Sequence, residues 1–137
     1  MLSLELIKQL DNAPKYLYNY AIIIGNRLSR EYEDIILEDI EFTYLYIKDI
    51  IKGRWERGEC VIKNNANYSY WYAKDIIMGR FIEGEEIISK NPNLAYLYAR
   101  NIIEGRWERG EMAIFQNRKI AYLYKQYIRE AEKNISK

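Results

Sequence analysis

Residues 98–111 read YARNIIEGRWERGE, and variants of this string recur along the chain. A Tyr-x-Tyr tripeptide starts at Tyr44, Tyr70, Tyr96 and Tyr122, so each copy lies 26 residues after the one before. A second block keeps the same step and reads Gly53-Arg54-Trp55, Gly79-Arg80-Phe81 and Gly105-Arg106-Trp107. A fixed period of this length is typical of repeat proteins, in which every copy is one supersecondary unit that packs against its neighbours.

The 26-residue repeat predicts an all-α fold: a short α-solenoid of antiparallel helix pairs, with about ten helices in one domain. An earlier, divergent copy starts at Tyr16, 28 residues before Tyr44, so it carries a two-residue insertion that we place between Gly25 and Glu33. The end units are more polar than the others, as a solenoid needs in order to seal its core. The predicted parts are a half repeat at 1–11, the divergent repeat at 12–39, regular repeats at 40–65, 66–91 and 92–117, and a capping helix at 118–137.

Each regular repeat is expected to hold a longer helix A and a shorter helix B. In the repeat at 66–91, helix A is expected from Asn67 to Met78 and helix B from Glu83 to Lys90. Asparagines that can cap helix A stand just before it, at Asn65, Asn91 and Asn117. Pro92 follows Asn91 and suits the first turn of a helix, where a missing N–H costs no hydrogen bond. The glycines expected to end helix A in a left-handed conformation are Gly53, Gly79 and Gly105. Glycine weakens a helix interior by about 1 kcal/mol, so the recurring glycines of helix B indicate close helix approach: Gly58, Gly84 and Gly110.

The string at 98–111 resembles short tandem repeats in proteins of phages, large DNA viruses and their hosts. Those repeats read Tyr-Ala-x-x-Val-Ile-x-Gly-Arg-Trp-Pro-Glu-Ala-Glu, and the likeness covers residues 44–124 well and 12–43 poorly. The chain departs from the pattern in having Glu56, Ile82 and Glu108 where the repeats have proline, and glycine where they have alanine. The resemblance implies a stacked-helix fold and an origin in a mobile element, and it carries over no catalytic residue.

The composition argues against most enzyme classes. The 137 residues include no histidine and one cysteine, Cys60, and the net charge is +1. Without histidine the chain lacks the most versatile acid–base group and the commonest metal ligand. No motif for phosphate, metal or nucleophilic chemistry is present, so we expect no enzyme activity, no cofactor and no metal. A signal peptide and a membrane span are not evident, which predicts a protein of the host-cell cytoplasm that does not bind membranes.

Two ladders of cations recur with the repeat. The first, Arg54, Arg80 and Arg106, stands beside an aromatic row formed by Trp55, Phe81 and Trp107. It is interpreted as structural, with each arginine bonding helix-end carbonyls or Glu59, Glu85 or Glu111; the alternative is a ligand ladder that stacks on bases. The second ladder is expected to be a solvated face rather than a phosphate track, and its members are Lys48, Lys74 and Arg100. The aromatic row and most tyrosines are expected in the core.

The segment at 31–41 departs most from the repeat, because it holds six acids and no base: Glu31, Glu33, Asp34, Glu38, Asp39 and Glu41. Two interpretations stay open, a drifted end unit or a contact surface for a protein partner with a basic surface. The sequence therefore predicts a non-enzymatic protein-binding module, a phage-encoded inhibitor that docks on a host defence protein such as a nuclease. The alternative is a nucleic-acid or nucleotide binder that uses the arginine and aromatic ladders.

Overall fold

The computed structural model describes residues 1–135, and all regular structure in that range is helical. This part of the chain contains ten α-helices, of which three continue into π-helical turns and one follows a 3-10 turn, so the predicted all-α class with about ten helices is confirmed. The chain divides into two units, Met1–Ile62 and Lys63–Lys137, which are described separately. The solenoid arrangement of the whole chain stays a prediction.

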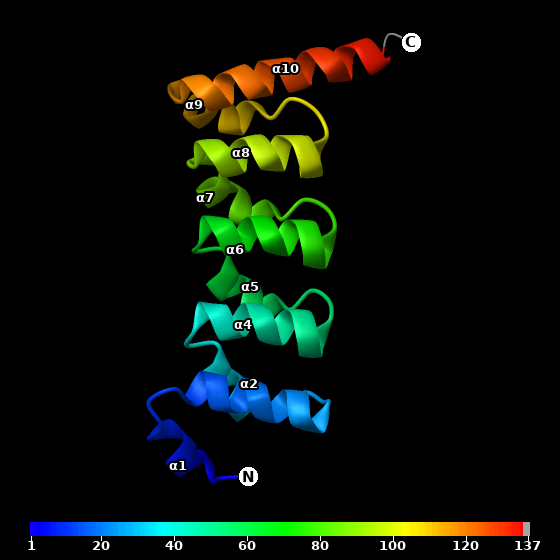
Figure 1. Ribbon diagram of the computed structural model, residues 1–137. Coiled ribbons are helices and arrows are strands. Elements are labelled where there is room, and N and C mark those ends of the chain that lie inside the picture. Colours follow the sequence, from blue (N-terminus) through cyan, green and yellow to red (C-terminus); the bar gives the residue numbers. More distant parts are fainter. Residues whose placement is uncertain (136–137) are drawn as a thin grey trace. The chain divides into compact units, whose positions relative to one another are not determined.

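The first unit contains the divergent repeat and the first regular one. Within it, α2 packs against α3 and α4, and α4 packs against α5 (Figure 1). Its helices are α1 (Leu4–Lys8), α2 (Ala13–Ile24), α3 (Arg30–Ile36), α4 (Ile40–Tyr46), the π-helical turn η1 (Ile47–Ile51) and α5 (Glu56–Ile62).

The second unit repeats this helix pairing and ends in a longer helix. The A helices α6, α8 and α10 lie side by side, while α7 and α9 pack against them as B helices (Figure 1). The elements are α6 (Ala66–Trp71), η2 (Tyr72–Ile77), η3 (Ile82–Gly84), α7 (Glu85–Ser89), α8 (Pro92–Tyr98), η4 (Ala99–Ile103), α9 (Glu108–Gln116) and α10 (Arg118–Ile135).

The helix starts match the sequence prediction. The Asn65 side chain accepts a hydrogen bond from the Tyr68 N–H at 3.0 Å, and Asn91 and Asn117 accept equivalent bonds at 3.0 and 3.1 Å. Pro92 occupies the first turn of α8, where its missing N–H leaves no hydrogen bond unmade. These caps fix where each A helix begins, and so they keep the repeats in register.

The helix ends differ from the prediction by one residue. Gly53, Gly79 and Gly105 do not take the left-handed conformation; the residue before each does, with φ of 58° at Lys52, 57° at Met78 and 60° at Glu104. The cause is the π-helical last turn, whose wider hydrogen-bond pattern brings the Lys52 N–H to the Ile47 carbonyl at 2.7 Å. Only the divergent repeat ends on a left-handed glycine, Gly25, with φ of 64°.

The core of each repeat is aromatic, as predicted. Trp55, Phe81 and Trp107 are 6%, 0% and 5% exposed, and each lies against the tyrosine nine residues before it. The helix B glycines allow this packing. An added Cβ at Gly84 would stand 2.6 Å from the Phe81 ring and 2.9 Å from Ser69 Cβ, and Gly58 and Gly110 are equally crowded.

Candidate functional site: a repeated Arg-Glu-Tyr network

The same polar network recurs around three glutamates, Glu33, Glu85 and Glu111. In each, an arginine just after helix A binds a glutamate on helix B, and that glutamate accepts a hydrogen bond from a tyrosine on the following helix A. The networks include two arginines of the first ladder, Arg80 and Arg106, and one acid of the segment at 31–41, so their geometry bears on whether these groups are available to a ligand.

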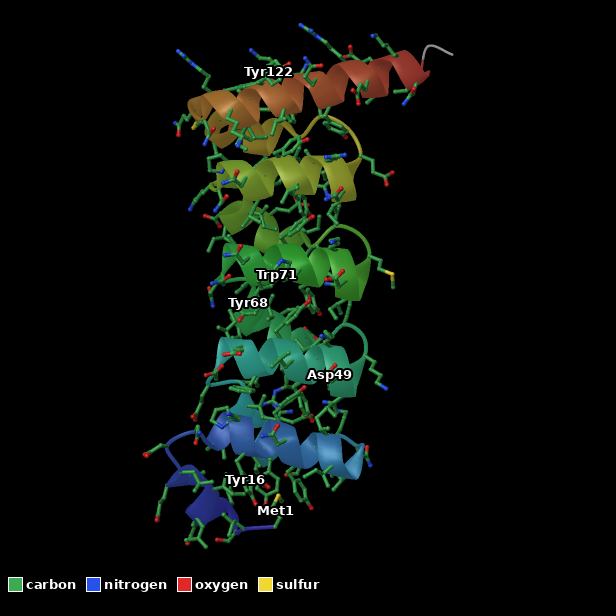
Figure 2. All side chains as sticks on the ribbon, in the orientation of Figure 1. Met1, Tyr16, Asp49, Tyr68, Trp71 and Tyr122 are labelled. Atoms are coloured by element: carbon green, nitrogen blue, oxygen red, sulfur yellow. The ribbon has the colours of Figure 1, made fainter. Side chains whose placement is uncertain are left out.

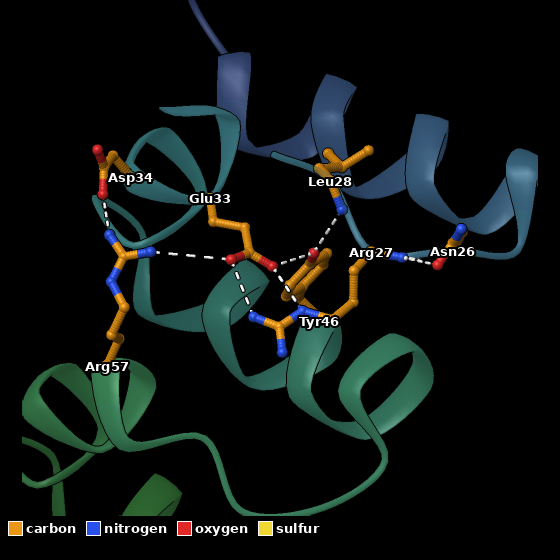
Figure 3. A network of polar contacts seen from close by, with 7 residues as sticks. All are labelled: Asn26, Arg27, Leu28, Glu33, Asp34, Tyr46 and Arg57. Atoms are coloured by element: carbon orange, nitrogen blue, oxygen red, sulfur yellow. Dashed lines mark hydrogen bonds and ion pairs between the residues drawn. The ribbon is translucent and has the colours of Figure 1, made fainter. Parts of the chain in front are cut away.

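In the first unit the network centres on Glu33 of α3, which is 3% exposed (Figure 3). Arg27 donates two hydrogen bonds to its carboxylate, both at 3.0 Å, and the Tyr46 hydroxyl donates a third at 2.6 Å. A second guanidinium, from Arg57 of α5, lies 3.8 Å away. The Leu28 N–H donates to the Tyr46 oxygen at 2.9 Å, which ties the loop after α2 to α4.

The second unit contains two copies of the network. Arg80 donates two hydrogen bonds, of 2.7 and 2.6 Å, to the Glu85 carboxylate, and the Tyr98 hydroxyl donates a third at 2.5 Å. The Phe81 N–H donates to the Tyr98 oxygen at 3.1 Å. In the last copy, Arg106 donates hydrogen bonds of 3.3 and 3.0 Å to Glu111, and the Tyr124 hydroxyl donates one of 2.8 Å to the same carboxylate.

Burial and hydrogen bonding shift the pKa values of these groups. Burial, followed by the bond to Glu33, raises the pKa of Tyr46 to about 12, and burial also raises that of Tyr124 to about 12. The pKa of Tyr98 is raised still further by burial and by Glu85. Burial acts to raise the pKa of Glu85, but the hydrogen bonds from Arg80 and Tyr98 outweigh it and the pKa is lowered. The pKa of Glu111 is lowered as well, first by its hydrogen bond from Arg106, so near neutral pH the two networks of the second unit hold charged carboxylates and neutral phenols.

This geometry favours the structural interpretation of the arginine ladder. Each of Arg54, Arg80 and Arg106 makes a two-bond ion pair with the glutamate five residues later, which is the structural arrangement expected from the sequence. The neighbouring aromatic rings are buried and cannot stack on bases. A ligand could reach only the outer faces of these arginines, whose side chains are 52–61% exposed.

The acidic segment is only partly a surface. Glu33 was expected to face a partner, and that expectation is wrong because it is buried in the first network. Asp34 forms an ion pair with Arg57 (Figure 3). Asp39 caps α4 by accepting a hydrogen bond from the Phe42 N–H at 3.1 Å. The three acids that are exposed, with no cation paired to them within residues 1–135, are Glu31, Glu38 and Glu41.

The second cation ladder is exposed, as expected for a solvated face: Lys48, Lys74 and Arg100. The polar residues after Lys48 and Arg100 each join two A helices within their unit. Tyr18 donates a hydrogen bond to Asp49, which Figure 2 labels, and Asn101 donates to the Tyr70 hydroxyl at 2.7 Å. Both bonds span 31 residues, so Asp49 and Asn101 have a structural role in the packing of successive A helices.

Sequence reasoning missed the tyrosine of the network. It assigned the Tyr-x-Tyr residues to the core without naming a hydrogen-bond partner, although a signal was present. Glu33, Glu85 and Glu111 each precede their tyrosine by 13 residues, a constant spacing that only the folded arrangement explains.

Comparison with family models, with curated proteins and with solved structures finds no match for this chain. Over the described part of the chain, no helix combines the length and apolar character needed to cross a membrane. Within the same residues no three or more His, Cys, Asp or Glu side chains gather in an arrangement that could hold a metal ion. The site is therefore interpreted from its own geometry.

Proposed function

We propose that this protein is a non-enzymatic module that binds a partner protein bearing a basic surface, and that the first unit supplies the contact. The resemblance of its repeats to those of phage and large-virus proteins makes a host enzyme the natural class of partner, such as a defence nuclease whose groove normally holds nucleic acid.

One observation carries the choice of a protein partner. Three consecutive isoleucines at the end of α2, Ile22, Ile23 and Ile24, are 45%, 82% and 46% exposed. Singly exposed apolar residues are ordinary, but adjacent ones mark surfaces that another protein covers. The same unit carries the exposed carboxylates Glu31, Glu38 and Glu41. One unit thus carries both exposed apolar side chains and exposed carboxylates, and protein interfaces combine an apolar core with a polar rim, whereas the carboxylates would repel phosphate.

The test begins with capture of a partner from host lysate and continues with its association kinetics. The variant Glu31→Gln/Glu38→Gln/Glu41→Gln should associate several-fold more slowly at low salt, because charge complementarity speeds encounter. The matched control removes three exposed acids of the second unit, Glu86→Gln/Glu108→Gln/Glu130→Gln, and should keep the parent's on-rate. Ile23→Ser should raise the off-rate without changing the melting temperature, since this side chain lies in solvent.

Equal on-rates and equal salt dependence for the acid variant and the parent would contradict the acidic contact surface. An unchanged off-rate for Ile23→Ser would contradict the apolar one. Retention of the parent on heparin at low salt, lost as salt rises, would instead favour the nucleic-acid alternative.

A further inference from the structure

A cavity of about 260 Å³ lies in the second unit where α9 meets α10. Its walls include two aromatic rings and one aliphatic side chain, from Phe115, Tyr124 and Ile128. The Phe115 and Tyr124 rings meet edge to face, with centroids 5.9 Å apart, so two rings border the same space.

The first unit shows what occupies the equivalent place in an interior repeat. There the Trp55 ring lies 5.5 Å from the Tyr46 ring and 5.8 Å from the guanidinium carbon of Arg27. Tyr124 and Arg106 are the counterparts of Tyr46 and Arg27 in the last network, and both line the cavity. The counterpart of an indole ring is therefore absent from this position.

The helix α10 explains the absence. In the three regular repeats helix A ends and a loop brings an aromatic ring back onto the tyrosine nine residues before it, as Trp107 lies on Tyr98 with ring centroids 4.6 Å apart. After Tyr124 the helix continues to Ile135, and the residue nine positions later, Lys133, is exposed on that helix. The one aromatic residue that follows Tyr124 within the described residues is Tyr127, whose ring lies 6.4 Å from that of Tyr124. Tyr127 does not line the cavity and so leaves the space open.

The charge of the cavity is strongly positive. Arg106, Lys125 and Arg129 line it, against one carboxylate, Glu111, which is already bonded to Arg106 and Tyr124. Lys125 and Arg129 stand four residues apart on α10 and so share a face, where like charges destabilise a helix. Neither has an ion pair with a carboxylate in the described range. The Lys125 ammonium lies 5.7 Å from the Phe115 ring, so cation and ring face the same region.

We propose that this cavity binds a planar aromatic ring that carries one anionic group. The ring would take the place that Trp55 fills in the first unit, between Tyr124 and Arg106, and the anion would bind Lys125 and Arg129. The volume lies just below the roughly 300–1,000 Å³ of drug-sized ligand sites, which suits a single ring system rather than an extended ligand. This ligand is independent of the protein partner proposed above, which contacts the other unit.

Aromatic acids and nucleoside monophosphates share this chemistry, and two probes separate them. Calorimetric titration with indole-3-acetate tests the aromatic acids, and titration with AMP tests the nucleotides. Saturable binding of either probe, with the other weaker, supports the site and names its source. Indole and acetate are the controls for the first probe, and adenosine and ribose 5-phosphate for the second; each should bind at least tenfold more weakly than the complete probe.

The variants place the binding in the cavity. Lys125→Gln/Arg129→Gln should weaken the bound probe tenfold or more, whereas Lys119→Gln/Lys133→Gln removes the same charge from the same helix and should leave binding unchanged. Ile128→Trp supplies the missing ring and should abolish binding while the protein retains its helical circular dichroism. The proposal is overturned if neither probe saturates at millimolar concentration, if an uncharged ring or a ringless anion binds as tightly, or if the two double variants behave alike.

Discussion

The first and last Arg-Glu-Tyr networks contain the same residue types in different surroundings. The side chain of Glu33 is 4% exposed and meets two guanidinium groups, those of Arg27 and Arg57. The side chain of Glu111 is 14% exposed, and its arginine, Arg106, is 61% exposed. The second cation at Glu33 comes from α5, the B helix of the next repeat. The motif thus fixes the bonds, while the repeat that follows supplies the burial.

The interior network of Glu85 agrees with this comparison. Its side chain is 2% exposed, and a further cation, Arg109 of the following B helix, helps to lower its pKa. After Tyr124 no such B helix follows within the described residues, because α10 runs on to Ile135. The same motif is therefore buried at Glu85, where another B helix follows it, and more exposed at Glu111, where α10 follows it.

The largest expected difference in stability is between Phe81, which is buried in an interior repeat, and Phe115, which lies beside the last network. Phe81→Ala should lower the free energy of unfolding by about 3–5 kcal/mol, because the ring is fully buried and leaves a cavity. Phe115→Ala should cost less than about 1 kcal/mol, since that side chain is 48% exposed. Urea unfolding followed by circular dichroism measures both. Equal losses would mean that the last network is as closed as the interior one.

The carboxylates should show the same contrast on a smaller scale. Glu85→Ala should destabilise by about 2 kcal/mol, because the buried Tyr98 hydroxyl loses its acceptor. Glu111→Ala should cost under about 1 kcal/mol, since Arg106 is already hydrated. Glu108→Ala, at an exposed position in the same helix, is the control. A larger loss at Glu111 than at Glu85 would reverse the comparison.

The stability of the protein should depend on pH through the tyrosines and glutamates of the Arg-Glu-Tyr networks. A raised tyrosine pKa contributes stability that is present below the unfolded value near 10 and is lost as pH rises toward 12. A lowered pKa at Glu85 and Glu111 contributes stability that is lost as pH falls below about 4.5. With no histidine in the chain, stability should stay nearly flat from about pH 5.5 to 9.

Above that range, each buried network tyrosine should account for a loss on the order of 1 kcal/mol by pH 11. Tyr98→Phe and Tyr124→Phe should each remove about that much of the alkaline loss, because burial raises both folded pKa values well above the unfolded value near 10. Melting temperatures across the pH range measure this. A steep change between pH 6 and 8 would show that another group governs stability.

The smallest effect compares the ends of the A helices. Met78→Gly should stabilise the protein by about 1 kcal/mol, because Met78 holds a left-handed conformation that glycine adopts without steric cost. Gly25→Ala should destabilise by a similar amount, while Gly79→Ala should be nearly neutral because its φ is not positive. Thermal melts of the three variants check this. If Gly79→Ala lowered the melting temperature more than Gly25→Ala, Gly79 rather than Met78 would be the left-handed residue, as the sequence alone predicts.

The features that the sequence determined are those that depend on local spacing. The 26-residue period predicted helix pairs, the asparagine caps, the buried Trp55, Phe81 and Trp107, and the crowded glycines of helix B, and the structure confirms them. Caps act within one turn of a helix, and side chains that recur at helical spacing share a face, so both can be read from neighbours in the chain.

Tertiary structure alone decided the features that depend on residues distant in sequence. The π-helical turn moved the left-handed position from Gly79 to Met78, because hydrogen bonding inside the folded helix sets how many residues its last turn holds. The burial of Glu33 required a tyrosine 13 residues later and an arginine on another helix. The cavity at Tyr124 exists because α10 continues as a helix where the regular repeats turn back, so no aromatic ring from a following loop packs on Tyr124 within the described residues.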